Sequence, residues 1–226
     1  MTTLKKLLVG AVFAATASIG ATAANAAVTI AAFGGYQTAL NPGEYLVSDF
    51  DGPLTLAPGW SLVGGDLVTG NHSSPDASAA PGLGPVHPTD DDQTQYLSVA
   101  GGESATFTTT GAKRVSLYIG SLDTGNHITF HTTSGDYFFD GADLGVVSGA
   151  VQYGDRHAID TNGRFTFQTD DLITGFTLFS KSDAFEISNI GSVVPEPATW
   201  AMMIIGFGGV GSMARSARRK QATAFA

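Results

Sequence analysis

Aspartates are the residues of this sequence whose type and spacing could bind a metal ion. Three adjacent carboxylates, Asp90, Asp91 and Asp92, close a proline-rich stretch, and Asp49 or Asp51 could add ligands from a second turn. Calcium takes carboxylate and carbonyl oxygens from loops, so this cluster is a candidate structural calcium site. The alternative is that Asp at turns caps backbone N–H groups and keeps the surface soluble. The same two interpretations apply to the pairs Asp140/Asp143 and Asp170/Asp171.

The histidines and glutamates form no recognisable catalytic pattern. His127 and His131 share a face if they lie in one strand, but about 13 Å would then separate them, too far to chelate one metal ion. The sequence has no nucleophile elbow, phosphate-binding loop, zinc-protease helix motif or EF-hand loop. It also has no cysteine, which excludes thiol catalysis and disulfide scaffolds. We therefore expect a protein that is not an enzyme. A secreted carbohydrate-active enzyme is the last alternative, after the two non-catalytic functions given at the end of this subsection.

Charge is distributed unevenly along the 226 residues, whose formal net charge is −9. Residues 27–194 carry 19 of the 20 acidic residues but five of the 11 bases, and the other six bases lie near the chain ends. Proteins that bind nucleic acids normally have a basic patch, so nucleic acid is not an expected partner.

Residues 1–26 have the three parts of a secretory signal peptide. Lys5 and Lys6 form the positive start, a nearly uninterrupted apolar run follows, and Ala24 and Ala26 provide a small-x-small cleavage site. We expect export through the Sec translocon and cleavage after Ala26 by signal peptidase.

Residues 194–220 combine a proline boundary, an apolar run and a basic cluster. Pro195 and Pro197 mark the start of a helix because proline is not tolerated in its interior. Residues 198–214 are 17 uncharged residues, about 25 Å as a helix, at the short limit for a transmembrane span. Trp200 would lie at the membrane interface, and the positive-inside rule places the basic cluster in the cytoplasm. That cluster is Arg215, Arg218, Arg219 and Lys220, followed by a short cytoplasmic end at 221–226.

This order of segments resembles the PEP-CTERM sorting tail, whose triplet is here Pro195-Glu196-Pro197. The resemblance implies processing by exosortase, a membrane transpeptidase-like enzyme of Gram-negative bacteria, during a transient stay at the inner membrane. It also implies a cell-surface or extracellular destination. The same tail is also named an ice-binding protein C-terminal motif, a name that does not imply ice binding. Residues 221–226 depart from the pattern, because many such tails end at the basic run.

Residues 27–193 alternate apolar and polar residues with the period of two that is typical of half-buried strands. Turn sequences separate the strands, and Asn162-Gly163 suits a two-residue hairpin turn. About ten to twelve short strands predict an all-β domain, an antiparallel β-sandwich or jelly roll, with no helix of ten or more residues. The long break at 70–92 contains four prolines and is either functional or disordered. The clearest alternating segments are 115–120, 128–131, 165–168, 176–178 and 185–187.

Segments 92–99, 115–123 and 184–190 resemble a group of exosortase-dependent surface proteins with lectin-like jelly rolls. The two end signals around an acidic β domain without catalytic motifs favour a non-catalytic surface or extracellular-matrix protein linked to exopolysaccharide or biofilm. The alternative is a carbohydrate-binding module that recognises exopolysaccharide through exposed aromatic rings. The candidate rings are Trp60, Tyr96, Tyr118 and Tyr137, although aromatic side chains of this kind are more often core or half-buried packing residues.

Overall fold

The computed structural model describes residues 27–70, 81 and 95–193. Within these ranges no helix is both long enough and apolar enough to cross a bilayer. Several predicted features lie outside the described residues: Ala24 and Ala26, Asp90–Asp92, the helix at 198–214, the sorting residues Pro195, Glu196, Pro197 and Trp200, and the basic residues Arg215, Arg218, Arg219 and Lys220.

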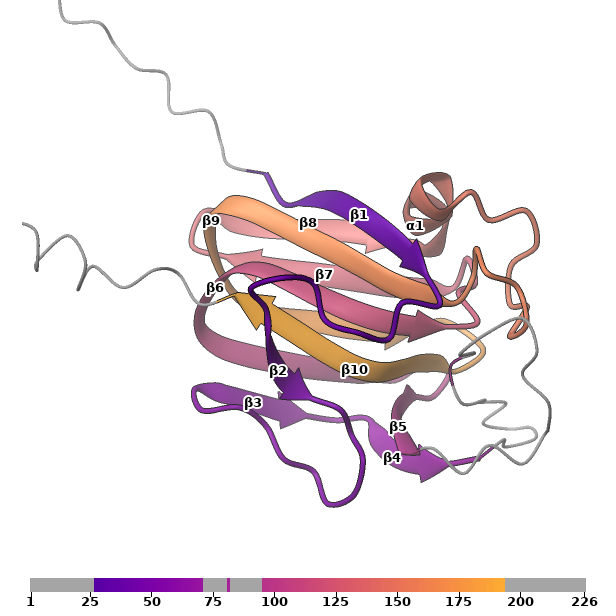
Figure 1. The fold of residues 1–226 in the computed structure, drawn as a ribbon, viewed down its shortest axis with the longest axis horizontal. Coiled ribbons are helices and arrows are strands. Elements are labelled where there is room, and N and C mark those ends of the chain that lie inside the picture. The colour runs from indigo at the N-terminus through magenta and orange to yellow at the C-terminus, as the bar shows by residue number, and fades with distance from the viewer. Residues whose placement is uncertain (1–26, 71–80, 82–94, 194–226) are drawn as a thin grey trace, which may run out of the picture.

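The described chain forms antiparallel β-structure with one short helix, which confirms the all-β prediction (Figure 1). The lectin-like jelly roll stays a prediction. The elements are β1 (Thr29–Gly35), β2 (Tyr45–Ser48), β3 (Trp60–Val63), β4 (Asp66–Thr69), β5 (Gln95–Val99), β6 (Ser104–Gly120), β7 (Asn126–Thr132), β8 (Gly135–Asp140), α1 (Gly141–Ser148), β9 (Gly163–Ser180) and β10 (Phe185–Val193).

Two long strands, β6 and β9, pair with each other and take part in both halves of the domain. Their register shifts between Thr108 and Arg114, where Gly111 has a φ of 140° that an L side chain rarely adopts. On one side of this irregularity β6 pairs with β3 and β9 pairs with β7. On the other side β6 pairs with β10 and β9 pairs with β1. We call the first half, with β8 and β3 at its edges, the hairpin layer, and the second half, with β2, β5 and β4, the terminal layer.

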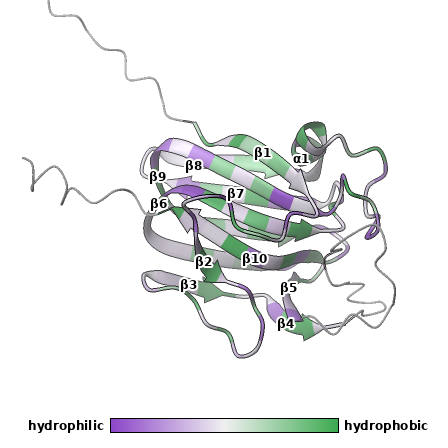
Figure 2. Ribbon diagram, viewed as in Figure 1, coloured by the Kyte–Doolittle hydropathy of each residue, from purple (hydrophilic) through white to green (hydrophobic). Residues whose placement is uncertain are grey.

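The hydrophobic core lies between these two layers. Phe130 of β7 does not pair with the first part of β9, yet its ring centroid lies 4.6 Å from that of Phe167. Phe107 and Phe176 stack at 4.7 Å within the hairpin layer, and Trp60 meets Phe176 edge-on at 6.3 Å. The period of two is visible as alternating hydropathy along the strands (Figure 2). Large aromatic side chains contribute most of the apolar area that such a core buries.

The helix α1 was not predicted, and its eight residues are too few to give an amphipathic stripe. Its ends carry clear signals instead. Asp143 N donates to Asp140 Oδ1 at 2.9 Å and Asp140 N donates to Asp143 Oδ2 at 3.1 Å, which is a capping box. Gly149 ends the helix in the left-handed conformation with a φ of 77°.

Two expectations about individual segments differ from the structure. Segments 165–168 and 176–178 belong to the single strand β9 rather than to two strands. The expected hairpin at Asn162-Gly163 is wrong, because Asn162 ends the loop after α1 and Gly163 begins β9. The Asn162 side chain is buried, accepting from Ser121 N at 3.0 Å and donating to the Asp155 carbonyl at 2.9 Å. It therefore fastens that loop to the end of β6.

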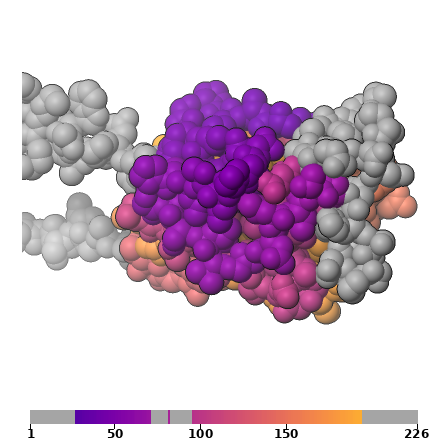
Figure 3. Space-filling model, turned by 90° about the horizontal axis from the view of Figure 1, so that it is seen from below, coloured from indigo at the N-terminus to yellow at the C-terminus, as the bar shows by residue number. Residues whose placement is uncertain are grey.

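The first strand of the domain begins, and its last strand ends, on the same side of the molecule. β1 begins, and β10 ends, at the left in Figure 1. Seen from below, the N-terminal residues, in indigo to purple, form much of the near surface (Figure 3). The segment between β1 and β2 crosses the outer face of the terminal layer, where Arg164 of β9 donates to the carbonyls of Thr38 and Ala39.

Candidate functional site

The aromatic rings that could have stacked on a sugar lie in the interior. Tyr96 and Tyr118 are fully buried and Trp60 is 8% exposed, so the prediction of exposed platforms is wrong for all three. Their polar atoms are satisfied internally: Trp60 Nε1 donates to Tyr45 Oη at 2.9 Å and Tyr96 Oη to the Gly70 carbonyl at 2.8 Å. Burial raises the pKa of the Tyr118 phenol. Tyr137 is partly buried and packs against the core.

The described aspartates cap backbone groups rather than gather around a metal ion. Asp49 Oδ1 accepts from Asp51 N at 3.2 Å, and the pair Asp140/Asp143 caps α1. Asp171 accepts from the Thr133 hydroxyl and from Ser134 N, and these hydrogen bonds lower the pKa of its carboxyl. No group of three metal-ligating side chains is present in the described ranges. The calcium prediction at Asp90–Asp92 concerns residues outside them.

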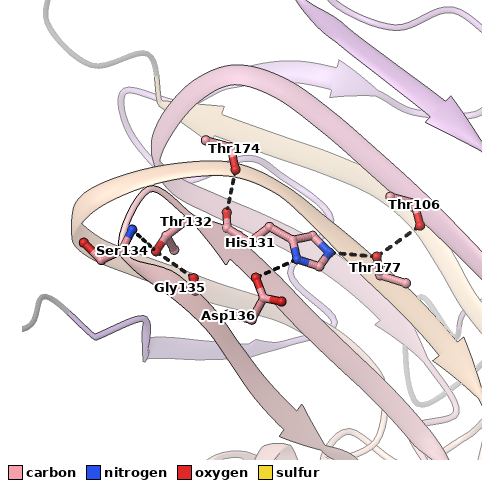
Figure 4. A network of polar contacts seen from close by, with 8 residues as sticks. All are labelled: Thr106, His131, Thr132, Ser134, Gly135, Asp136, Thr174 and Thr177. Carbon is pink, nitrogen blue, oxygen red and sulfur yellow. Dashed lines mark hydrogen bonds and ion pairs between the residues drawn. The ribbon is translucent and has the colours of Figure 1, made fainter.

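His131 belongs to a polar network on the hairpin layer (Figure 4). Its Nδ1 lies 2.9 Å from Asp136 Oδ1, and its Nε2 lies 2.9 Å from Thr177 Oγ1, which in turn lies 3.0 Å from Thr106 Oγ1. Carboxylate, imidazole and hydroxyl follow one another in the order used by general-base catalysis. Asp136 is 65% exposed here and the hydroxyl is already shared with a second threonine. The network therefore acts as a cross-strand tie between β6, β7, β8 and β9.

His127 lies on the same face as His131, as the strand prediction required. Its ring stacks on Phe179 with centroids 5.5 Å apart and meets Phe138 edge-on at 5.1 Å. The two histidines thus have separate partners, an aromatic pair in one case and polar side chains in the other.

A row of residues crosses four strands of the terminal layer near the start of β1 and the end of β10. Thr29 of β1 lies opposite Gln168 of β9, Gln168 opposite Arg114 of β6, and Arg114 opposite Val193 of β10. Directly opposed residues of antiparallel strands project from the same face, so these side chains share the outer face of the terminal layer. Three strand spacings separate Thr29 from Val193, about 14 Å.

A cavity of about 710 Å³ lies beside this row. Besides the row, Ala27, Lys113 and Asp170 line it, and Pro42 and Gly43 form another part of its wall. The Lys113 ammonium donates to the Asp170 carbonyl oxygen. A second cavity, of about 330 Å³, shares Arg114 and Gln168 with the first. Arg114 therefore lines two cavities of the same face.

The adjacent part of this face contains a buried cation, Arg164, which the segment between β1 and β2 covers. Arg164 is 1% exposed, and its Nη1 donates to Ser116 Oγ at 2.9 Å and its Nε to the Ala39 carbonyl at 2.9 Å. Ser116 Oγ passes the interaction on by donating to Glu44 Oε2 at 2.8 Å. Burial lowers the pKa of Arg164, an effect that the nearby Glu44 carboxylate opposes.

Strand β10 ends at Val193, which lines the cavity. A known sequence motif begins at the same residue. Residues 193–220 match the family model of the PEP-CTERM protein-sorting motif. The PEP-CTERM motif implies an exosortase as the processing partner and export to the cell surface or the extracellular space. No curated protein matches the chain.

The cavity beside the PEP-CTERM motif was missed by sequence reasoning. Its strongest signal was available: Lys113 and Arg114 are adjacent bases in a segment that has only five. What sequence could not provide was the pairing that brings Ala27 and Val193, at opposite ends of the domain, to line one cavity.

Proposed function

We propose that the protein is a non-catalytic exported surface or extracellular-matrix protein that exosortase sorts through its PEP-CTERM motif. The observation that carries the proposal is the continuity of the motif with β10. This strand pairs with β6 on one side and with β2 and β5 on the other, and the motif begins at its last residue, Val193. Cleavage near Pro195–Pro197 would therefore separate the tail without removing any described strand.

The position of the two chain ends supports transit at the inner membrane of a Gram-negative bacterium. A signal peptide at 1–26 and a tail helix at 198–214 would both insert into that membrane. Ala27 and Val193 line the same cavity, so both segments can reach one bilayer while the domain between them is folded. The Sec translocon and signal peptidase would act at the first end and exosortase at the second.

The non-catalytic part of the proposal is supported by the work that the polar side chains do. Asp140 and Asp143 cap a helix, Asp171 clamps a turn, and His131 ties neighbouring strands. The proposed association with exopolysaccharide or biofilm follows from the resemblance of the domain to exosortase-dependent surface proteins.

Intact mass measurement of the mature protein from its producing cells tests both ends together. We expect an N-terminus at Ala27 and a C-terminus near Pro195–Pro197. A Glu196→Ala variant should remain unprocessed in the membrane fraction, whereas Glu103→Ala, which alters an exposed glutamate of the domain, should mature normally. Deletion of the exosortase should reproduce the Glu196→Ala result. An unprocessed protein in the cytoplasm would show the proposal to be wrong.

A further inference from the structure

The bases of the domain are concentrated where the tail begins. Residues 27–194 contain Lys113, Arg114, Arg156, Arg164 and Lys181 against 19 acids. Arg164 is buried and has its partners, so four bases remain for the surface. Two of these four, Lys113 and Arg114, line the cavity next to Val193. A strongly acidic domain thus presents a local positive charge where the PEP-CTERM motif begins.

The two bases are positioned differently but face the same space. An ammonium carries three N–H donors, so the contact of Lys113 with the Asp170 carbonyl holds the group in place without using all of them. The Arg114 guanidinium has no hydrogen-bond or ion-pair partner among the described residues. Guanidinium presents a planar set of donors that matches two oxygens of a phosphate. The Thr29 hydroxyl and the Gln168 amide, in the same row, add polar groups to the wall.

Removal of the signal peptide would add a third positive charge to this cavity. Cleavage after Ala26, part of the proposed export, creates a free α-amino group on Ala27, which lines the cavity. Asp170 is the one carboxylate among the lining residues. The mature cavity would then hold three cationic groups against one anionic group.

We propose that this cavity binds the phosphate of an anionic phospholipid headgroup while the PEP-CTERM tail is still in the membrane. The proposal rests on the proposed export and tail insertion. Val193 lies five positions before the start of the predicted span at Ala198, at most about 18 Å of extended chain. The cavity is therefore within reach of the headgroup layer. Attraction at this edge would set the orientation of the domain, because its remaining acidic surface is repelled by an anionic bilayer.

The absence of cysteine from the chain allows a site-specific test. The mature chain, 27–226, is reconstituted in vesicles of phosphatidylcholine with or without phosphatidylglycerol and with a headgroup-attached quencher. A fluorophore is placed at Leu46→Cys, an exposed residue of β2 opposite Gly191 of β10, or at Val151→Cys, an exposed residue of the loop after α1. We expect quenching at the first position only in vesicles with phosphatidylglycerol, and none at the second position.

Charge variants decide whether the cavity causes this docking. Each base at an anionic surface is worth a factor of about five, so Lys113→Gln with Arg114→Gln should lower the docked-to-undocked ratio about 30-fold. Acetylation of the Ala27 amino group should lower it about fivefold. The control Arg156→Gln with Lys181→Gln makes the same change in net charge away from the cavity and should have little effect. Equal losses in the two double variants, or equal docking without phosphatidylglycerol, would overturn the proposal.

Two further arms separate the other anions that could occupy the cavity. Inorganic phosphate is titrated at constant ionic strength into the protein in phosphatidylcholine vesicles. Saturable binding of phosphate that depends on Lys113 and Arg114, combined with no docking to phosphatidylglycerol, would assign the cavity to soluble phosphate. That result would overturn the lipid proposal. If Glu196→Gln increases docking as strongly as the double variant decreases it, the resident anion is the tail carboxylate, and the lipid assignment is again wrong. Processing is followed in parallel by mass, so failure of docking is distinct from failure of sorting.

Discussion

Two arginines on the outer face of the terminal layer show how differently one residue type can be used. Arg164 of β9 is 1% exposed, and donates to two backbone carbonyls and two side chains. Arg114 of β6 lies on the same face, is half-buried, and borders two cavities. The segment between β1 and β2 covers the first arginine, while the cavities adjoin the second.

The difference follows from the cost of removing a charge from water. A buried guanidinium is tolerated only when acceptors replace its hydration, and Arg164 has such acceptors from three separate segments. Such a group holds the fold in one arrangement and offers nothing to a ligand. Arg114 is half-buried and lines two cavities, so its guanidinium remains accessible to water and to an incoming anion. The comparison therefore assigns the first arginine to stability and leaves the second available for the proposed binding.

The largest expected effect is that of removing the buried cation. Arg164→Met should lower the free energy of unfolding by about 3–5 kcal/mol, because the Glu44 network and the Thr38 and Ala39 carbonyls lose their donor. Urea unfolding of the mature chain measures this loss. Arg164→Lys keeps the charge but not the planar set of donors. Its free energy of unfolding should therefore lie between those of the unsubstituted protein and of Arg164→Met. A loss below about 1 kcal/mol for the Met variant would contradict the structural role.

A smaller effect is expected from the anion of the same network. Glu44 accepts from Asn41 N at 3.0 Å, from Asn41 Nδ2 at 2.9 Å and from Ser116 Oγ at 2.8 Å. In Glu44→Gln one of the two acceptor oxygens becomes a donor, so about 1–2 kcal/mol should be lost. Glu103→Gln, at an exposed turn, is the control and should leave the urea midpoint unchanged. Equal midpoints for the two variants would show that the charge on Glu44 is not needed.

Local patterns were enough to predict several of the strands, but not this network. The segments around Phe165, Phe176 and Phe185 alternate regularly, and each lies in a strand as predicted. Segments 165–168 and 176–178 form one strand, because β9 continues through the register shifts in its pairing with β6 and β7 near Gly175. Asn162-Gly163 has the composition of a hairpin turn, but long-range hydrogen bonds to Ser121 and Asp155 determine its conformation.

The sorting motif could be predicted from the sequence, but the cavity beside it could not. The PEP-CTERM tail is a local signal, so its motif was found from residue order alone and the family model matches it. The cavity depends on pairings between residues far apart, such as Thr29 with Gln168 and Arg114 with Val193. The prediction of exposed aromatic rings was wrong for the same reason. Tyr96 and Tyr118 have partners within the fold that no local pattern reveals.

Asp171 extends the comparison to a half-buried anion, next in sequence to Asp170 of the cavity. Hydrogen bonds from Thr133 and Ser134 hold its pKa below the ordinary value, so its carboxylate stabilises the folded state. The sign follows from linkage: the contribution is complete above the pKa of about 3.9 in the unfolded chain and is lost as the pH falls through the lower folded value. Asp171→Asn should therefore lower Tm slightly at pH 7, and the difference should shrink below about pH 4. A difference that stays constant down to pH 2 would show that the charge is not involved.

The smallest effect on stability is expected at the second arginine, and this result completes the comparison. Arg114→Met should change the free energy of unfolding by less than about 1 kcal/mol, because its guanidinium is bound to no other described residue and stays hydrated. The same substitution should weaken docking of the tailed protein to anionic vesicles. Urea unfolding and headgroup quenching on one preparation measure both quantities. Arg164→Met should give the reverse result in mild conditions where it stays folded, with lower stability and unchanged docking. If Arg114→Met instead costs as much stability as Arg164→Met, both arginines serve the fold, and the binding role of the cavity would have to be abandoned.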